Sequence, residues 1–154
     1  MTAPPVPGLV TAFHVCARLG PLADHGRTRA GHRRVVPIVG GRITGIFDAD
    51  IVAGGADWQV VRPDGAIEID TRYSALTGAG SHVYLRTFGV RSGPPEVLRA
   101  LARGEPVDPG EYYFRLGVRL ETSDPELAEL EHHLFVASAV RDADEVRYTA
   151  YRVT

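Results

Sequence analysis

The chain has 154 residues, 44% hydrophobic and 23% charged, a balance typical of a globular protein of one domain (residues 1–154) and not of a disordered chain. Its formal net charge of −2 gives no electrostatic reason to expect nucleic acid or an anionic membrane as a partner, and no apolar run is long enough to span a bilayer. All 17 residues of the Lys and Arg class are Arg, which excludes Schiff-base catalysis and the phosphate-binding lysine of a P-loop.

The first half of the chain consists mainly of predicted β-strands. After a flexible segment over residues 1–10, alternating apolar residues predict a strand at residues 11–19, and the polar stretch 20–34 is expected to be a loop. Further strands are expected at residues 35–39, 42–47, 56–61, 66–76 and 81–90. The sequence Arg62-Pro63-Asp64-Gly65 predicts a hairpin turn, because Pro presets φ and Gly accepts a positive φ.

The second half of the chain adds two short helices to the strands. Val97, Leu98 and Leu101 have helical spacing and predict a helix over residues 95–103. A second helix is expected from Ser123-Asp124-Pro125-Glu126, which has the residues of a capping box, to about His132. The remaining strands are expected at residues 112–121, 134–140 and 145–153. Roughly eight strands with two short helical inserts indicate an all-β fold, a small antiparallel barrel that is closed or nearly closed.

Three predicted strands, at residues 66–76, 81–90 and 112–121, carry one apolar and one polar face, since alternate residues of a strand point to opposite sides. The polar faces include Glu68, Asp70, Arg72, Ser74, His82, Tyr84, Arg86, Phe88, Tyr113, Arg115, Arg119 and Glu121. In one interpretation these faces lie in water and the apolar faces form the core, as in most antiparallel sheets. In the other they line a cavity inside the barrel, which requires ion pairs within the set because buried Arg must be paired.

No motif in the chain predicts a cofactor or a metal. The histidines lack HxH or HExxH spacing, and the adjacent pair His132-His133 has poor geometry for one ion. Neither glycine pair belongs to a dinucleotide motif, and no Ser lies in a GxSxG elbow. The only cysteine, Cys16, excludes an internal disulfide and favours a reducing compartment, so we expect a cytoplasmic protein.

Short motifs that follow one another along the chain carry a family resemblance. They are Gly54-Gly55-Ala56-Asp57-Trp58-Gln59, Arg62-Pro63-Asp64-Gly65, Asp70-x-Arg72-Tyr73, Tyr84-x-Arg86, Gly93-Pro94-Pro95-Glu96-Val97, Tyr112-Tyr113-Phe114-Arg115 and Arg119-x-Glu121-Thr122. Together they resemble domain-of-unknown-function family 3237, also called uncharacterised protein family 0311, from about Phe13 to Val153. The resemblance implies a small calycin-like or lipocalin-like barrel, often dimeric, with a polar-lined internal cavity. It therefore favours the interpretation in which the charged faces point inward.

With the charged faces inside, we expect a cofactor-independent enzyme, a lyase or isomerase. It would dehydrate, cyclise or isomerise an aromatic or polyketide-like natural-product intermediate by proton transfer. Asp57 or Glu121 would be the general acid or base. Arg86 and Arg115 would hold a carboxylate or stabilise an enolate, and Tyr84 would donate a proton or orient the substrate. The other expected substrate-binding residues are Trp58, which would form an apolar wall, and Asp70, Arg72, Tyr113 and Arg119.

Two alternatives remain open from the sequence. A non-catalytic lipocalin-like carrier needs the same pocket but no proton-transfer pair. A scaffold protein that uses its apolar strand faces would oligomerise and have no pocket. In the favoured interpretation the partners are a small-molecule substrate and a second copy of the chain, with no nucleic acid and no membrane.

Overall fold

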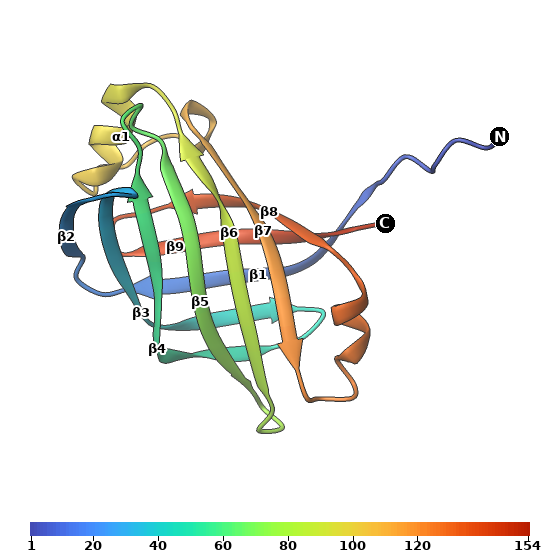
Figure 1. The fold of residues 1–154 in the computed structure, drawn as a ribbon. Coiled ribbons are helices and arrows are strands. Elements are labelled where there is room, and N and C mark those ends of the chain that lie inside the picture. The colour runs from blue at the N-terminus through green and yellow to red at the C-terminus, as the bar shows by residue number, and fades with distance from the viewer.

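An antiparallel sheet of nine strands closes on itself in the computed structural model, which describes residues 1–154 (Figure 1). The strands are β1 (Leu9–Leu19), β2 (Ala23–Thr28), β3 (Gly31–Gly45), β4 (Ala49–Val61), β5 (Ile67–Thr77), β6 (His82–Ser92), β7 (Tyr113–Thr122), β8 (Phe135–Arg141) and β9 (Glu145–Val153). Their order is β1-β9-β8-β7-β6-β5-β4-β3-β2, and an additional β1–β3 pairing closes the ring. Eight strands thus form the wall of a closed barrel, with short β2 beside β3, which confirms the predicted fold class.

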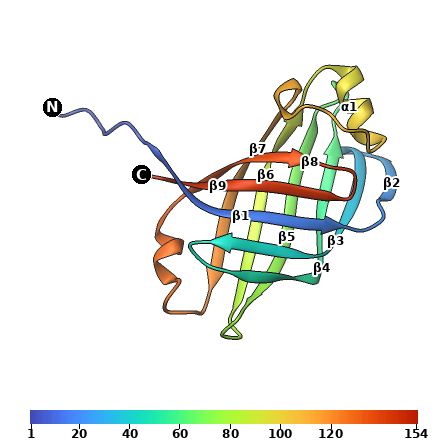
Figure 2. The same ribbon diagram turned by 180° about the vertical axis from the view of Figure 1, so that it is seen from behind.

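The barrel wall has two layers whose strands cross steeply. In Figure 1, β4 to β7 run along the front of the molecule, while β1, β8 and β9 pass behind them. Figure 2 shows the same crossing from the other side, where β1 lies between β9 and the second half of β3. Strands β3 and β4 belong to both layers, because each bends at an irregularity in its pairing.

Glycine residues make these bends possible. Gly41 has φ 137°, and a Cβ atom at this position would collide with the carbonyl oxygen of Cys16 on β1. Gly54, with φ 119°, lies where the β4–β5 pairing skips from Val52 to Ala56. The strand predicted at residues 56–61 is therefore too short at its start, where the glycine pair precedes it. The strand starts at Ala49, and the glycines form a bulge inside it.

The prediction of a loop at residues 20–34 is also wrong in part. It contains β2 and the first residues of β3, which pair with each other through Asp24↔Arg34 and Thr28↔Gly31. Nearly every side chain of β2 is exposed or half-buried, so the alternation of apolar residues that reveals a strand is missing there. Backbone pairing at the edge of the barrel, and not burial, defines this strand.

One of the two predicted helices is present. Helix α1 (Pro95–Ala102) covers one end of the barrel and buries Val97 and Leu101. The second forms only a 3-10 turn, η2 (Ala128–His132), and a further 3-10 turn, η1 (Pro109–Glu111), precedes β7. Asp124 does accept a hydrogen bond from the Glu126 N–H, as a cap would. However, the backbone bonds that follow join residues three apart, so an α-helix never starts.

The end of the barrel opposite α1 has a hydrocarbon core. There Phe13 packs against Phe47 and Phe135, with ring centroids 5.4 and 5.7 Å apart. Residues 1–8 have no regular structure and project away from the barrel wall (Figure 1). The helices present are too short and too polar to cross a lipid bilayer.

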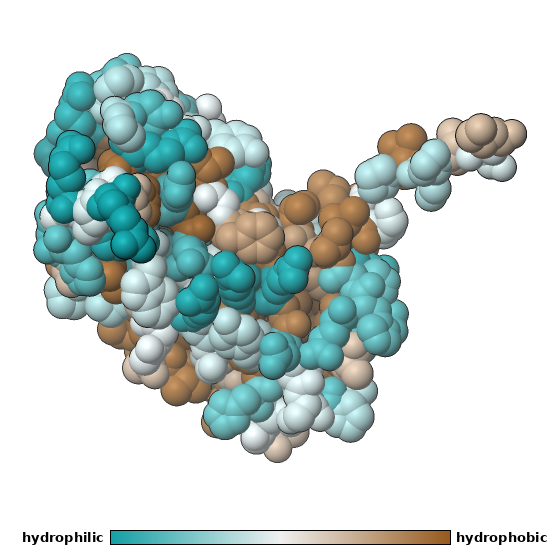
Figure 3. Space-filling view, in the orientation of Figure 1, coloured by the Kyte–Doolittle hydropathy of each residue, from teal (hydrophilic) through white to brown (hydrophobic).

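The face shown in Figure 3 is largely polar, with an apolar stretch near the base of the projecting segment. This stretch is a groove on the outer wall between β6–β7 and β8. Its exposed apolar residues are Leu9, Phe88, Tyr113, Leu134 and Val136. The groove lies outside the barrel and is therefore separate from the interior.

Candidate functional site

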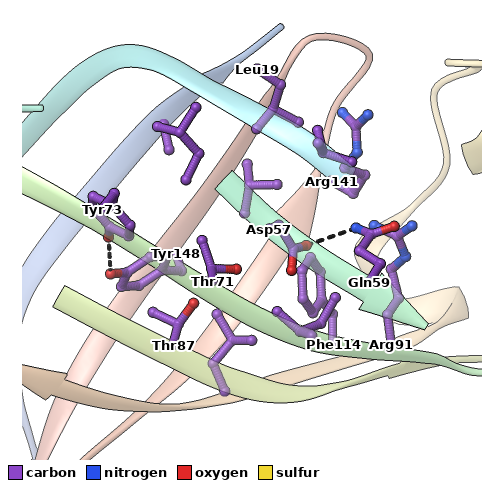
Figure 4. Close-up of a pocket in the computed structure, with 16 residues that line it drawn as sticks. Leu19, Asp57, Gln59, Thr71, Tyr73, Thr87, Arg91, Phe114, Arg141 and Tyr148 are labelled. Atoms are coloured by element: carbon purple, nitrogen blue, oxygen red, sulfur yellow. Dashed lines mark hydrogen bonds between the residues drawn. The ribbon is translucent and has the colours of Figure 1, made fainter. Parts of the chain in front are cut away.

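The half of the barrel interior nearest α1 contains a cavity with polar side chains (Figure 4). The centre of a water molecule can occupy about 40 Å³ of this cavity. One bound water needs roughly 10–15 Å³ on this measure, so the cavity has room for a few waters or one compact ligand. Its polar lining residues are Asp57, Gln59, Thr71, Tyr73, Thr87, Arg91, Arg141 and Tyr148. The rest of the lining is mostly hydrocarbon, from Leu19, Val36, Ile38, Ile69, Phe114, Leu116 and Val146.

Asp57 is the only carboxylic acid among the lining residues. It points inward from β4 and is 8% exposed. Its Oδ2 accepts a hydrogen bond of 2.7 Å from Gln59 Nε2, and its Oδ1 accepts one of 3.1 Å from the backbone N–H of Asp70. Burial raises the pKa of Asp57, and the hydrogen bonds from Gln59 and the Asp70 N–H only partly oppose that shift. A buried carboxyl with a raised pKa is suited to giving and taking a proton.

Three arginines surround Asp57 at the α1 end of the cavity. Arg91, from the end of β6, is 4% exposed, and its guanidinium lies 5.4 Å from the centre of the Phe114 ring. Burial lowers the pKa of Arg91 to about 10, with smaller contributions from the charges of Arg141 and Arg34. Arg34 donates a 2.9 Å hydrogen bond to Gln59 Oε1 from behind the cavity wall. All three groups are cations at neutral pH, so this end of the cavity carries excess positive charge.

A pair of tyrosines lies deeper in the cavity. The hydroxyl groups of Tyr73 on β5 and Tyr148 on β9 are 2.5 Å apart and fully enclosed. Burial raises the pKa of both phenols, so both stay neutral and can donate hydrogen bonds. Thr71 and Thr87 are paired across β5 and β6 and lie between the tyrosines and Asp57 (Figure 4). The polar groups therefore form one row along the cavity.

The expected inward placement is wrong for every predicted site residue except Asp57. Trp58 is 37% exposed on the outside of β4, between the inward-facing Asp57 and Gln59. The others on the outer wall are Tyr84, Arg86, Glu121, Asp70, Arg72, Arg115, Tyr113 and Arg119. The alternate residues of the same strands, such as Ile69, Leu85 and Leu116, fill the interior instead. Burying the apolar set stabilises the barrel, whereas burying the charged set would require many desolvated ion pairs.

The outer wall does bring several of these residues together. Asp70 lies 3.5 Å from Arg72 and 3.4 Å from Arg86, in ion pairs that are open to solvent. Tyr84, Arg86, Arg119 and Glu121 line an outer groove next to His133. The Arg115 guanidinium stacks 5.2 Å from the Tyr113 ring. Their roles in substrate binding or catalysis stay predictions, and the interior cavity does not involve them.

Most of the polar groups inside the barrel were not predicted, although the sequence contains a signal for them. Thr71 and Tyr73 share the apolar face of the strand predicted at residues 66–76, where they interrupt a run of hydrocarbon side chains. Arg91 and Arg141 each lie one residue beyond the predicted end of their strand, on the side that points inward. Extending each strand by one residue would have placed both guanidiniums in the barrel.

The histidines, cysteine and carboxylates do not form any group of three or more that could hold a metal ion. The polar set of the cavity is instead one carboxyl group, one amide, two guanidiniums and four hydroxyl groups. Such a set can transfer protons and hold oxygen atoms of a ligand by hydrogen bonds.

Comparison with known proteins places the chain among relatives of the same size. The sequence model of the family described as "Protein of unknown function (DUF3237)" matches residues 7–153. A UPF0311 protein of Bradyrhizobium diazoefficiens is 42% identical over 141 residues, which cover 92% of this chain and 93% of the relative. A UPF0311 protein of Clostridium acetobutylicum is 36% identical over 125 residues, 80% of this chain and 79% of the relative.

Solved structures have the same barrel. A conserved protein of unknown function from Rhodopseudomonas palustris has a TM-score of 0.92 and 39% identity, covering 99% of this chain and 100% of that one. A β-barrel-like protein from Acinetobacter baumannii has a TM-score of 0.87 and 38% identity over the whole of both chains. A protein from Penicillium herquei described as an enzyme has a TM-score of 0.74 at 17% identity, covering 100% of this chain and 99% of that one, and it shares the fold.

Proposed function

Because this chain belongs to DUF3237, a family of unknown function, its own cavity has to indicate a role, and we propose a cofactor-independent enzyme that transfers protons on a small oxygenated molecule. One observation carries the proposal. A buried carboxyl, Asp57, shares a small cavity with a pair of neutral phenols and with a guanidinium that has unused donors. The expected reaction class is dehydration, cyclisation or isomerisation, which makes the enzyme a lyase or an isomerase.

Asp57 is the proposed general acid and base. As a carboxylate it takes a proton from the carbon next to a carbonyl of the ligand, and the electron pair moves to the carbonyl oxygen to give an enolate. Return of the proton at another position completes an isomerisation. Loss of a β-hydroxyl group, protonated by Asp57 as it leaves as water, completes a dehydration. The raised pKa of Asp57 makes it a stronger base than an exposed aspartate, and such a group contributes about 10²–10⁴-fold to a rate.

The tyrosine pair is proposed to stabilise the enolate. One phenol O–H is used up within the pair, because Tyr73 and Tyr148 bond to each other. The second O–H has no partner among the residues described and can be donated to an oxygen of the ligand. A donor that is fixed before the reaction, in a cavity with little water, stabilises developing negative charge without having to reorganise.

The Penicillium herquei protein supports an enzymatic role, because it shows that this barrel shape occurs in an enzyme. At 17% identity it does not supply a substrate or residue roles for this chain. The same cavity also suits a carrier, since its hydrocarbon walls enclose a ligand from most sides. The two roles differ in one respect, which is whether the bound molecule exchanges a proton.

Hydrogen–deuterium exchange measures that difference directly. We would incubate the protein in D2O with cyclohexanone and with levulinate, and follow loss of the protons next to each ketone by NMR. We expect faster exchange than in buffer alone for at least one ketone, and a rate at least about 10²-fold lower in Asp57→Asn. Asp70→Asn is the matched control, since it removes an exposed carboxylate and keeps the backbone N–H that Asp57 uses.

Circular dichroism of each variant would verify that the barrel is folded. If both ketones bind but neither exchanges its protons, the protein is a carrier and the enzymatic proposal is wrong. An unchanged exchange rate in Asp57→Asn would equally refute the role of this carboxyl.

A further inference from the structure

The α1 end of the cavity has more positive than negative charge. Arg34 and Arg141 lie close enough to Arg91 to lower its pKa, Arg34 also lowers the pKa of Arg141, and Asp57 is the one carboxylate within the cavity. Among the lining residues, two cations against one acid leave an excess of one positive charge when Asp57 is ionised, and of two when it is protonated. A barrel interior screens charge poorly, so this excess is costly unless an anion joins it.

Arg91 shows the imbalance most clearly. Its side chain is 4% exposed, and its Nε and Nη1 atoms are buried without a hydrogen-bond partner. Native proteins nearly always satisfy buried polar groups, and a guanidinium offers five N–H donors in a planar fork. The ring of Phe114 faces part of this group but cannot satisfy its N–H groups fully.

The nearby acids, apart from the exposed Asp144, are already engaged. The two oxygens of Asp57 accept hydrogen bonds from Gln59 and from the Asp70 backbone. Asp142 and Glu145, on the turn that follows Arg141, both face Arg147 on the outside of β9. Asp24 pairs with His32 on β2 and β3. None of these carboxylates is placed to bond Arg91, so the partner that it lacks has to come from outside the chain.

We propose that the carboxylate of a small organic ligand binds at Arg91, with Arg141 beside it, and that the remainder of the ligand extends toward the tyrosine pair. This inference rests on the proposed function in placing the ligand in the same cavity. It names the substrate class as a compact hydroxy or oxo carboxylic acid.

The geometry of the cavity favours a carboxylate held in this orientation. A carboxylate binds one edge of a guanidinium with both oxygens at once, through Nε and Nη2 or through Nη1 and Nη2, so either edge of Arg91 would give a partner to one of its two free donors. The hydrocarbon residues Ile69 and Leu116 then lie along the carbon chain of the ligand, and the phenols of Tyr73 and Tyr148 lie beyond it. The small volume limits the ligand to a few non-hydrogen atoms besides the carboxylate.

Binding of butyrate, with 1-butanol as its neutral counterpart, tests the inference. We would titrate the full-length protein with each and follow the backbone amide signals of Gln59, Thr71 and Arg91 by NMR. We expect butyrate to bind at least tenfold more tightly than 1-butanol. We expect Arg91→Met to lose at least tenfold in butyrate affinity and nothing in 1-butanol affinity. Arg72→Met, which removes an exposed guanidinium from the outer wall, should change neither.

Arg91→Lys keeps the charge while losing the fork, so it should bind butyrate with an intermediate affinity and serves if Arg91→Met does not fold. Equal affinities for butyrate and 1-butanol would overturn the inference, as would butyrate binding that survives Arg91→Met. Inorganic phosphate that binds at these same amides more tightly than butyrate would also overturn it, because the site would then select phosphate.

The Asp57→Asn variant separates this inference from the proposed function. It removes the neighbouring negative charge, so butyrate should bind at least as tightly as to the unchanged protein. Cyclohexanone exchange without butyrate binding would leave the enzyme proposal standing and refute the anion site. Butyrate binding at Arg91 without any proton exchange would support the anion site and refute the enzyme proposal.

Discussion

Removing one hydroxyl group from the buried tyrosine pair should cost more than removing both. The Tyr73 and Tyr148 oxygens lie 2.5 Å apart, and both side chains are buried. In Tyr73→Phe the hydroxyl of Tyr148 keeps its burial and loses its partner, and such an orphaned group costs about 2 kcal/mol. For a chain of this length that corresponds to a fall in Tm of roughly 4–8 °C. The double variant leaves no orphan, so we expect it to cost less than about 1 kcal/mol.

The four proteins to compare are the unsubstituted chain, Tyr73→Phe, Tyr148→Phe and the double variant. Urea denaturation of each, followed by circular dichroism, gives the coupling energy of the pair. We expect about 3–4 kcal/mol, since two single losses of about 2 kcal/mol each do not add to the double loss of less than about 1 kcal/mol. Tyr84→Phe on the outer wall is the control and should change the free energy of unfolding by less than about 0.5 kcal/mol. Additive losses would refute the reasoning. Single losses below about 0.5 kcal/mol would also refute it, because a water in the cavity would then be satisfying the remaining hydroxyl.

Three further predictions concern other buried groups. Folding raises the pKa of Asp57, so the contribution of Asp57 to stability is greatest when the group is protonated and declines as the pH rises from about 4. The stability gained by Asp57→Asn should therefore grow with pH, which urea denaturation of both proteins over a pH series would measure. Gly41→Ala should lower the free energy of unfolding by more than about 2 kcal/mol, since its φ is 137° and the new Cβ meets the β1 backbone, whereas Gly78→Ala has open space and should cost under about 0.5 kcal/mol. Burial and then the hydrogen bond to Glu145 raise the pKa of the Cys16 thiol to about 11, so mass spectrometry should show slow alkylation by iodoacetamide at pH 8 and faster alkylation in Glu145→Ala.

The class of fold follows from the sequence because period-two alternation is a local property. The hairpin turn at Arg62-Pro63-Asp64-Gly65 and the helix over Pro95–Ala102 were predicted for the same reason, since each depends on neighbouring residues. Strand β2 was missed because all of its residues are exposed or half-buried, so no alternation reveals it. The start of β4 was missed because the bulge at Gly54-Gly55 interrupts the strand.

The sequence pattern within each strand could not show which of its two faces points into the barrel. Alternation separated the two faces of β5, β6 and β7 correctly, but both faces were compatible with a barrel. The pairing register decides the matter, since it places Arg72, Arg86 and Arg119 side by side on three neighbouring strands. A row of three like charges is tolerable in water and prohibitive in a closed interior. The register depends on the whole sheet, so the expectation of a polar cavity, drawn from the family resemblance, led the site assignment to the wrong face.

The closure of the ring by its first strands has a consequence for how a ligand would affect folding. Ala17 on β1 and Tyr148 on β9 belong to the cavity wall together with Thr71 and Thr87 from the middle of the chain. The chamber therefore exists only after contacts between residues more than a hundred positions apart have formed, and these are the slow contacts in β-proteins. A molecule bound there recognises the completed ring alone, so it shifts the equilibrium of the entire chain toward the native state. A rise in melting temperature on adding a compound would thus report binding to the closed barrel without a labelled probe.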